Sequence, residues 1–198
     1  ALPILSIPVM DLSAFLKSLK SVYSFLELAT KSHMTAILSL GHDKVAHILK
    51  ALEDGLVAFD TPVALNCCVT IDNMCTYLVQ PNENEDEMNA IRDTLENNAT
   101  RGALVRIMIL MNHLSMSGEF ASTWSLSRPF LGLILVCKPE FLALRTSIVA
   151  QQPNPERQKH VETCYDDLMK GVNEDLLTKN RETFTKNLYQ FGINVRSS

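Results

Sequence analysis

The residues best suited to chemistry are histidines and cysteines, and one such pair shares a helix face. His160 and Cys164 stand four positions apart in a helical stretch, so the imidazole could lower the pKa of the thiol. A thiol nucleophile also needs a group that orients its base and a donor for an oxyanion, and the sequence supplies neither beside this pair. A small helical enzyme built on His160 and Cys164 is therefore kept only as a hypothesis. We expect Cys164 to react slowly with alkylating agents.

Metal and disulfide chemistry has little support. His42 and His47 stand five positions apart with no third ligand nearby, which is typical of surface histidines. The neighbours Cys67 and Cys68 would point to different helix faces, whereas Cys68 and Cys75 lie two turns apart, too far to bridge. Five cysteines without a secretory signal indicate reduced thiols in the nucleus or cytosol. The phosphate-binding, dinucleotide-binding, hydrolase and zinc-protease motifs are absent, so we predict no catalytic residue, no metal and no cofactor.

Composition and charge exclude several classes of protein. The 198 residues are 46% hydrophobic and 20% charged, as in a packed globular chain rather than a disordered one. The net charge of −4 lacks the basic surplus of a nucleic-acid-binding protein, so no DNA partner is expected. The longest stretch without a charged residue, Ile107–Gly118, is shorter than the roughly 20 residues that span a bilayer. No membrane partner is expected either.

The elements that would position these residues are helices. Only 7 glycines and 8 prolines are present, while leucine, alanine, methionine and asparagine are frequent, which favours an all-α protein. Asp11 predicts the start of a first helix, and Asp60, just before a first-turn proline, predicts the start of another. Gly41, Gly55 and Gly171 stand where helices are expected to end. About nine or ten helices joined by short loops follow from this pattern.

The predicted helices recur in pairs about every 40 residues, which matches the period of HEAT-like repeats. The predicted pairs cover residues 11–40, 42–79, 88–116, 125–151 and 155–195. We therefore predict an all-α fold, an α-solenoid of HEAT-like antiparallel helix pairs, with a closed helical bundle as the alternative.

One linker-like stretch, residues 80–87, contains four acidic residues and is predicted to be an acidic loop between helices. The longer segment Glu83–Glu96 carries a net charge of −5, and Leu176–Ser198 carries +3. Segments of opposite charge could steer partners, although surface charges of this size usually form only a solvated face.

Two long stretches of the chain, Ala51–Leu78 and Ser122–Phe191, resemble the C-terminal end of exportin-7-like nuclear transport receptors. These receptors belong to the importin-β (karyopherin) superfamily. The strings that carry the resemblance best are WSLSRPFLGLIL (Trp124–Leu135), LMKGV (Leu168–Val172) and LLTKNRETFTKNL (Leu176–Leu188). They are long and unbroken, which argues against coincidence.

This resemblance implies a solenoid of HEAT repeats that wraps Ran-GTP and a folded protein cargo. Such a receptor meets nuclear pore proteins and shuttles between nucleus and cytoplasm. Residues 1–198 would be the last four to five helix pairs of a larger chain. The main Ran contacts of the superfamily lie in N-terminal repeats that this sequence lacks, so no Ran-binding residue is carried over. The alternative is a Ran-independent HEAT-repeat scaffold for protein interactions.

The recognisable string around Arg128 is expected to be mostly core. The residues expected between repeats are Trp124, Pro129, Phe130, Leu131, Leu133 and Leu135. Arg128 would cap or pair locally, or instead meet a protein cargo. An excised solenoid end would expose an apolar face, so the isolated segment is expected to be marginally stable or to self-associate through Ala1–Met10 and the first helix.

Overall fold

The computed structural model describes residues 16–58, 60–80 and 84–197, with side chains described from Lys20 onward. These residues form ten helices and no strand, so the predicted all-α class is confirmed. The predicted helix start at Asp11 lies outside them. The chain divides into two compact units, Ala1–Ile107 and Met108–Ser198, and each is described by itself.

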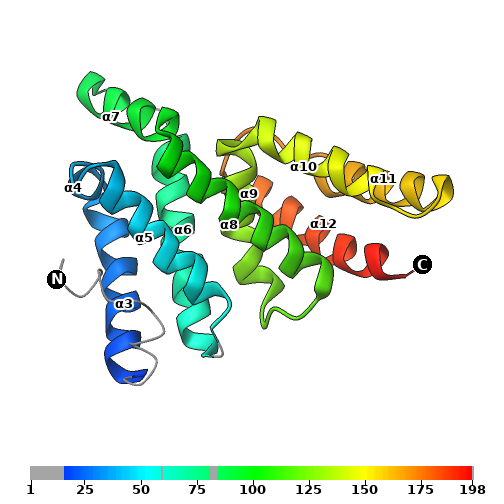
Figure 1. Cartoon of the computed structure of the whole chain (residues 1–198), viewed down its shortest axis with the longest axis horizontal. Coiled ribbons are helices and arrows are strands. Elements are labelled where there is room, and N and C mark those ends of the chain that lie inside the picture. The colour runs from blue at the N-terminus through cyan, green and yellow to red at the C-terminus, as the bar shows by residue number, and fades with distance from the viewer. Residues whose placement is uncertain (1–15, 59, 81–83, 198) are drawn as a thin grey trace. The chain divides into compact units, whose positions relative to one another are not determined.

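The helices of the first unit are α3 (Leu16–Ser32), α4 (Met34–Leu38), α5 (His42–Leu56), α6 (Thr61–Val79), α7 (Glu85–Glu96) and the first half of α8 (Asn98–Ser117). The second unit contains the rest of α8 with α9 (Thr123–Val136), α10 (Lys138–Ala150), α11 (Pro155–Met169) and α12 (Thr178–Arg196). Figure 1 shows α3, α5 and α6 side by side in the first unit.

Helices α3 and α6 run in the same direction. Lys20 Nζ lies 2.9 Å from an Asp60 carboxylate oxygen, and one helical turn further on Asn66 donates to Ser24 Oγ at 3.0 Å. The residue numbers therefore rise together along both helices. Asp60 also caps α6 as predicted, since its carboxylate accepts from the Val63 amide at 3.2 Å.

Gly55 does not end α5, contrary to the sequence prediction. The helix continues to Leu56, and Gly55 is buried within it. A Cβ atom at Gly55 would lie 2.4 Å from Cys67 Sγ on α6 and 2.8 Å from the Tyr23 ring on α3. The glycine therefore permits a close approach of three helices, which sequence spacing alone does not reveal. The other two predicted helix-ending glycines, Gly41 and Gly171, have φ of +89° and +70° and lie just beyond α4 and α11.

The acidic loop predicted for residues 80–87 is shorter than expected. Helix α7 begins at Glu85, so the acidic residues Glu85, Asp86 and Glu87 form its first turn. Asn84 caps the helix, because its side-chain oxygen accepts from the amides of Asp86 (3.0 Å) and Glu87 (3.4 Å). Negative charge at a helix N-terminus is stabilised by the aligned backbone dipoles, which favours helix over loop here.

Two of the predicted pairs, residues 88–116 and 125–151, are not hairpins. A single residue, Asn97, separates α7 from α8, and Cys137 alone separates α9 from α10. Reversing a chain between antiparallel helices takes about 2–5 residues, so these helices are joined end to end at a bend. The predicted pairs 42–79 and 155–195 are hairpins, formed by α5 with α6 and α11 with α12.

Aromatic rings fill the core of the second unit. Phe130 packs edge to face against Phe141 and Phe184, with ring centroids 6.3 and 5.9 Å apart. Tyr165 continues the chain of contacts, 6.1 Å from Phe141 and 5.0 Å from Phe191. These rings come from α9, α10, α11 and α12, so they join every full helix of the unit.

Candidate functional surfaces

The pair His160 and Cys164 does not form an activated thiol. His160 Nε2 lies 2.9 Å from the carbonyl oxygen of Asn194, which can only accept, so Nε2 carries a proton. The same nitrogen is the one that faces Cys164 Sγ, at 3.6 Å, and it cannot act there as a base. Burial raises the pKa of the Cys164 thiol further. The geometry therefore argues against the enzyme hypothesis.

The other cysteines are also buried and reduced. Burial raises the pKa of Cys68 to about 12 and that of Cys67 well above its ordinary value. Both thiols stay protonated at neutral pH, so they serve as small apolar groups in the packing of α6.

The described residues hold no group of three or more histidine, cysteine, aspartate or glutamate side chains that could bind a metal ion. His42 and His47 lie on α5, the first partly buried and the second exposed. Across residues 16–58, 60–80 and 84–197, no helix is long and apolar enough to cross a membrane.

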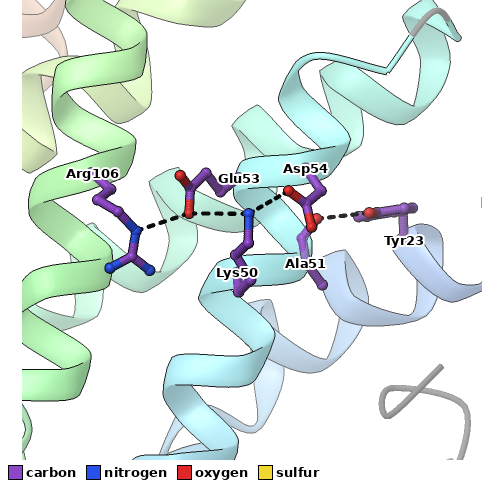
Figure 2. A network of polar contacts seen from close by, with 6 residues as sticks. All are labelled: Tyr23, Lys50, Ala51, Glu53, Asp54 and Arg106. Atoms are coloured by element: carbon purple, nitrogen blue, oxygen red, sulfur yellow. Dashed lines mark hydrogen bonds and ion pairs between the residues drawn. The ribbon is translucent and has the colours of Figure 1, made fainter. Parts of the chain in front are cut away.

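A charged network ties α5 to its neighbours in the first unit, and Figure 2 shows its members. Glu53 lies between Lys50, 3.8 Å away, and Arg106 of α8, 3.2 Å away. Lys50 also pairs with Asp54 at 2.6 Å, and this hydrogen bond raises the pKa of Lys50. Beside it the Tyr23 hydroxyl donates to a carbonyl oxygen of α5 at 2.7 Å. These charges are used within the unit, so the network is structural.

Part of the acidic segment is engaged as well. Tyr77 donates to a carboxylate oxygen of Glu87 at 3.2 Å, and its hydroxyl lies 3.0 Å from Thr35 Oγ1. Thr35 and Tyr77 line a polar hollow of about 330 Å³ along α3, α4 and α6. Glu87 therefore helps to hold α7 beside α4 rather than standing free to steer a partner.

The basic surplus of Leu176–Ser198 is smaller on the surface than in the sequence. Arg181 is buried, and its Nε donates to the carbonyl oxygen of Leu176 at 2.8 Å. Arg196 donates through Nη1 to the carbonyl oxygen of Met116 at 3.0 Å. Both guanidinium groups thus bond to backbone carbonyls, but only Arg181 is buried. Lys179, Lys186 and Arg196 remain the exposed cations of α12.

Trp124 is not a core residue, contrary to the sequence prediction. Its side chain is 60% exposed in the first turn of α9, whereas Pro129, Phe130, Leu131 and Leu133 are buried as predicted. The predicted core residue Leu135 is partly buried. Trp124 lies in the first turn of α9, and the buried residues of this helix begin only at Leu126.

Arg128 pairs locally with this exposed ring, as one of the two sequence interpretations expected. Its guanidinium carbon lies 4.8 Å from the centroid of the Trp124 ring, a cation–π contact between residues one helical turn apart. The Nε atom of Arg128 is buried and has no hydrogen-bond partner. The α9 start therefore presents an apolar ring and a half-buried cation together.

Comparison with known proteins identifies the family. Exportin-7-B of Xenopus laevis is 36% identical over 208 residues, which cover 98% of this chain and 18% of the relative. Ran-binding protein 17 of Mus musculus is 34% identical over 97% of the chain, and Ran-binding protein 16 of Drosophila melanogaster is 27% identical over 97%. The chain is exportin-7-like. It spans about 18% of the length of these relatives. No family model and no solved structure matches it.

The match to these relatives extends through both units of the chain. Sequence reasoning missed two features of this exportin-7-like chain: the close packing at Gly55 and the exposure of Trp124. A signal for the second was present, because an arginine one turn after a tryptophan is suited to a cation–π contact on a helix surface. No local signal marks Gly55, since its neighbours come from other helices.

Proposed function

We propose that this chain is the C-terminal HEAT segment of a nuclear export receptor. The receptor carries protein cargo through the nuclear pore in a Ran-GTP-dependent cycle, shuttling between nucleus and cytoplasm and meeting nuclear pore proteins on the way. The observation that carries the proposal is the 36% identity to Exportin-7-B across 98% of the chain. In this role the segment supplies curvature to the solenoid and surface for cargo, while Ran-GTP binds through N-terminal repeats outside it.

The chemistry of the described residues supports binding rather than catalysis. The one histidine–cysteine pair has its facing nitrogen protonated, and the pKa of its thiol is raised by burial. The charged network around Glu53 is used within its unit. What the helices offer outward is surface, including exposed aromatic and aliphatic side chains that a protein partner can cover.

The test is a pull-down of the native protein with Ran, loaded in parallel with a non-hydrolysable GTP analogue or with GDP. Retention only in the GTP form is the expected result and would support a transport receptor. Equal retention in both forms, or none in either, would contradict the Ran-dependent cycle and favour a Ran-independent HEAT scaffold.

A further inference from the structure

The exposed Trp124 and the half-buried Arg128 stand out in the second unit because together they combine apolar area with charge. Trp124 is the only tryptophan of the sequence, and 60% of its surface is exposed. The guanidinium carbon of Arg128 lies over the Trp124 ring, 4.8 Å from the ring centroid. Tryptophan and arginine are the residue types most enriched at the energetic centres of protein interfaces.

The arrangement leaves hydrogen-bonding capacity unused. The Nε–H of Arg128 is buried without an acceptor, and an unpaired buried donor costs free energy. No carboxylate pairs with Arg128 among the ion pairs of the described residues. The buried Nε lies out of a partner's reach, so a carboxylate brought by a partner would pair with the two outer guanidinium nitrogens and neutralise the charge there.

We propose that Trp124 and Arg128 anchor a docking surface for an acidic segment of a protein partner. A carboxylate of that segment pairs with the Arg128 guanidinium, and an apolar side chain next to it covers the Trp124 ring. This inference rests on the proposed function, because the partner is a protein held by a receptor, and it adds the chemistry by which that protein is recognised.

Two other occupants fit the site less well. A nucleic acid gains its affinity from several cations along the phosphate backbone, whereas this site holds one and the whole chain carries −4. A second copy docking the same surface on itself would bring Arg128 against its own equivalent, which like-charge repulsion opposes. An acidic protein segment meets neither difficulty.

The single tryptophan makes the site directly observable in this chain. The probe is a short synthetic peptide alternating glutamate and phenylalanine, and the matched probe alternates lysine and phenylalanine at the same length. We expect the glutamate peptide to shift the Trp124 emission in a saturable way. The affinity of this binding should fall as the salt concentration rises. No saturable shift, or an equal shift with the lysine peptide, would overturn the proposal. A saturable shift of the Trp124 emission on adding a single-stranded oligonucleotide would also overturn the proposal. The same holds for a saturable shift on raising the concentration of the chain with no peptide present.

Variants separate the two anchor residues. Arg128→Gln is expected to weaken glutamate-peptide binding about tenfold, and Trp124→Phe, measured by calorimetry, is expected to weaken it less. Lys159→Gln, an exposed cation on α11, is the control and is expected to leave binding unchanged. Circular dichroism verifies that each variant is folded. Unchanged binding by folded Arg128→Gln would overturn the site.

The outcome is separable from that of the Ran pull-down. Peptide binding without GTP-selective Ran retention would overturn the proposed function and support the site. GTP-selective Ran retention with no peptide binding would overturn the site and support the function.

Discussion

The two units of the chain bury their helices by opposite means. In the first unit, Gly55 removes a side chain, so that Cys67 and Tyr23 reach the backbone of α5. In the second, large rings such as Phe130 and Phe184 fill the space between helices. A core that depends on a missing side chain is intolerant of added atoms, whereas a core that depends on rings is intolerant of their removal.

The two buried tyrosines, Tyr23 and Tyr165, differ in the kind of acceptor to which their hydroxyl groups donate. Tyr23 donates to a backbone carbonyl of α5, which as a helix interior carbonyl has a further donor. Tyr165 donates instead to the buried side-chain oxygen of Asn112 at 3.0 Å. The first bond supplements a satisfied acceptor, and the second satisfies a side chain that water does not reach.

The largest expected effect is in the aromatic core. Phe130→Ala removes a fully buried ring that contacts both Phe141 and Phe184, and we expect a loss of about 3–5 kcal/mol in the free energy of unfolding. Denaturant unfolding followed by circular dichroism measures it. Trp124→Ala on the same helix is the control, with an expected loss below about 1 kcal/mol because the ring is exposed. Similar losses of stability for Phe130→Ala and Trp124→Ala would contradict the conclusion that α9 buries Phe130 and exposes Trp124.

Next in size is the glycine contact. Gly55→Ala is expected to cost about 2–3 kcal/mol, because steric overlap with Cys67 Sγ and the Tyr23 ring exceeds the gain in helix propensity of about 1 kcal/mol. Gly102→Ala is the matched control on α8, where the added Cβ would meet only Arg106 Nη1 at 3.8 Å, and it is expected to stabilise the protein. Adding Cys67→Ala to Gly55→Ala should recover part of the loss; strict additivity of the two changes would argue against direct contact.

Alkaline pH probes both cores together. The folded-state pKa values of Cys68 and Tyr165 are raised to about 12 by burial, above the ordinary 9.0 of a thiol and 10.0 of a phenol. Their contribution to stability is therefore complete below the unfolded-state values and is lost as pH rises toward 12. Stability should fall by about 1.4 kcal/mol per pH unit for each group, from pH 9 for Cys68 and from pH 10 for Tyr165.

Denaturant midpoints measured from pH 8 upward would show this decline. The variant Tyr165→Phe should have a shallower slope above pH 10, since it lacks one of the buried groups whose pKa is raised. A stability independent of pH in this range would mean that the thiol and phenol are solvated in the folded state.

The smallest effect is the contrast between the tyrosine hydroxyls. Tyr165→Phe should cost about 1–3 kcal/mol by leaving the Asn112 oxygen without this donor, and Tyr23→Phe about 0.5–1.5 kcal/mol. Both substitutions keep the ring, so the difference between their unfolding free energies measures how much each acceptor depends on the tyrosine hydroxyl. A larger loss for Tyr23→Phe would reverse the ranking of the two bonds.

By itself, the sequence determined the all-α class, the exportin-7-like family and most helix ends. Asp60 and Gly171 could be interpreted correctly because capping depends on residues within one helical turn. The tertiary structure alone decided the role of Gly55 and the exposure of Trp124. It also turned Arg181 from an expected surface charge into a buried donor. These outcomes depend on where side chains distant along the chain, or the solvent boundary, come to lie, and local spacing does not determine that.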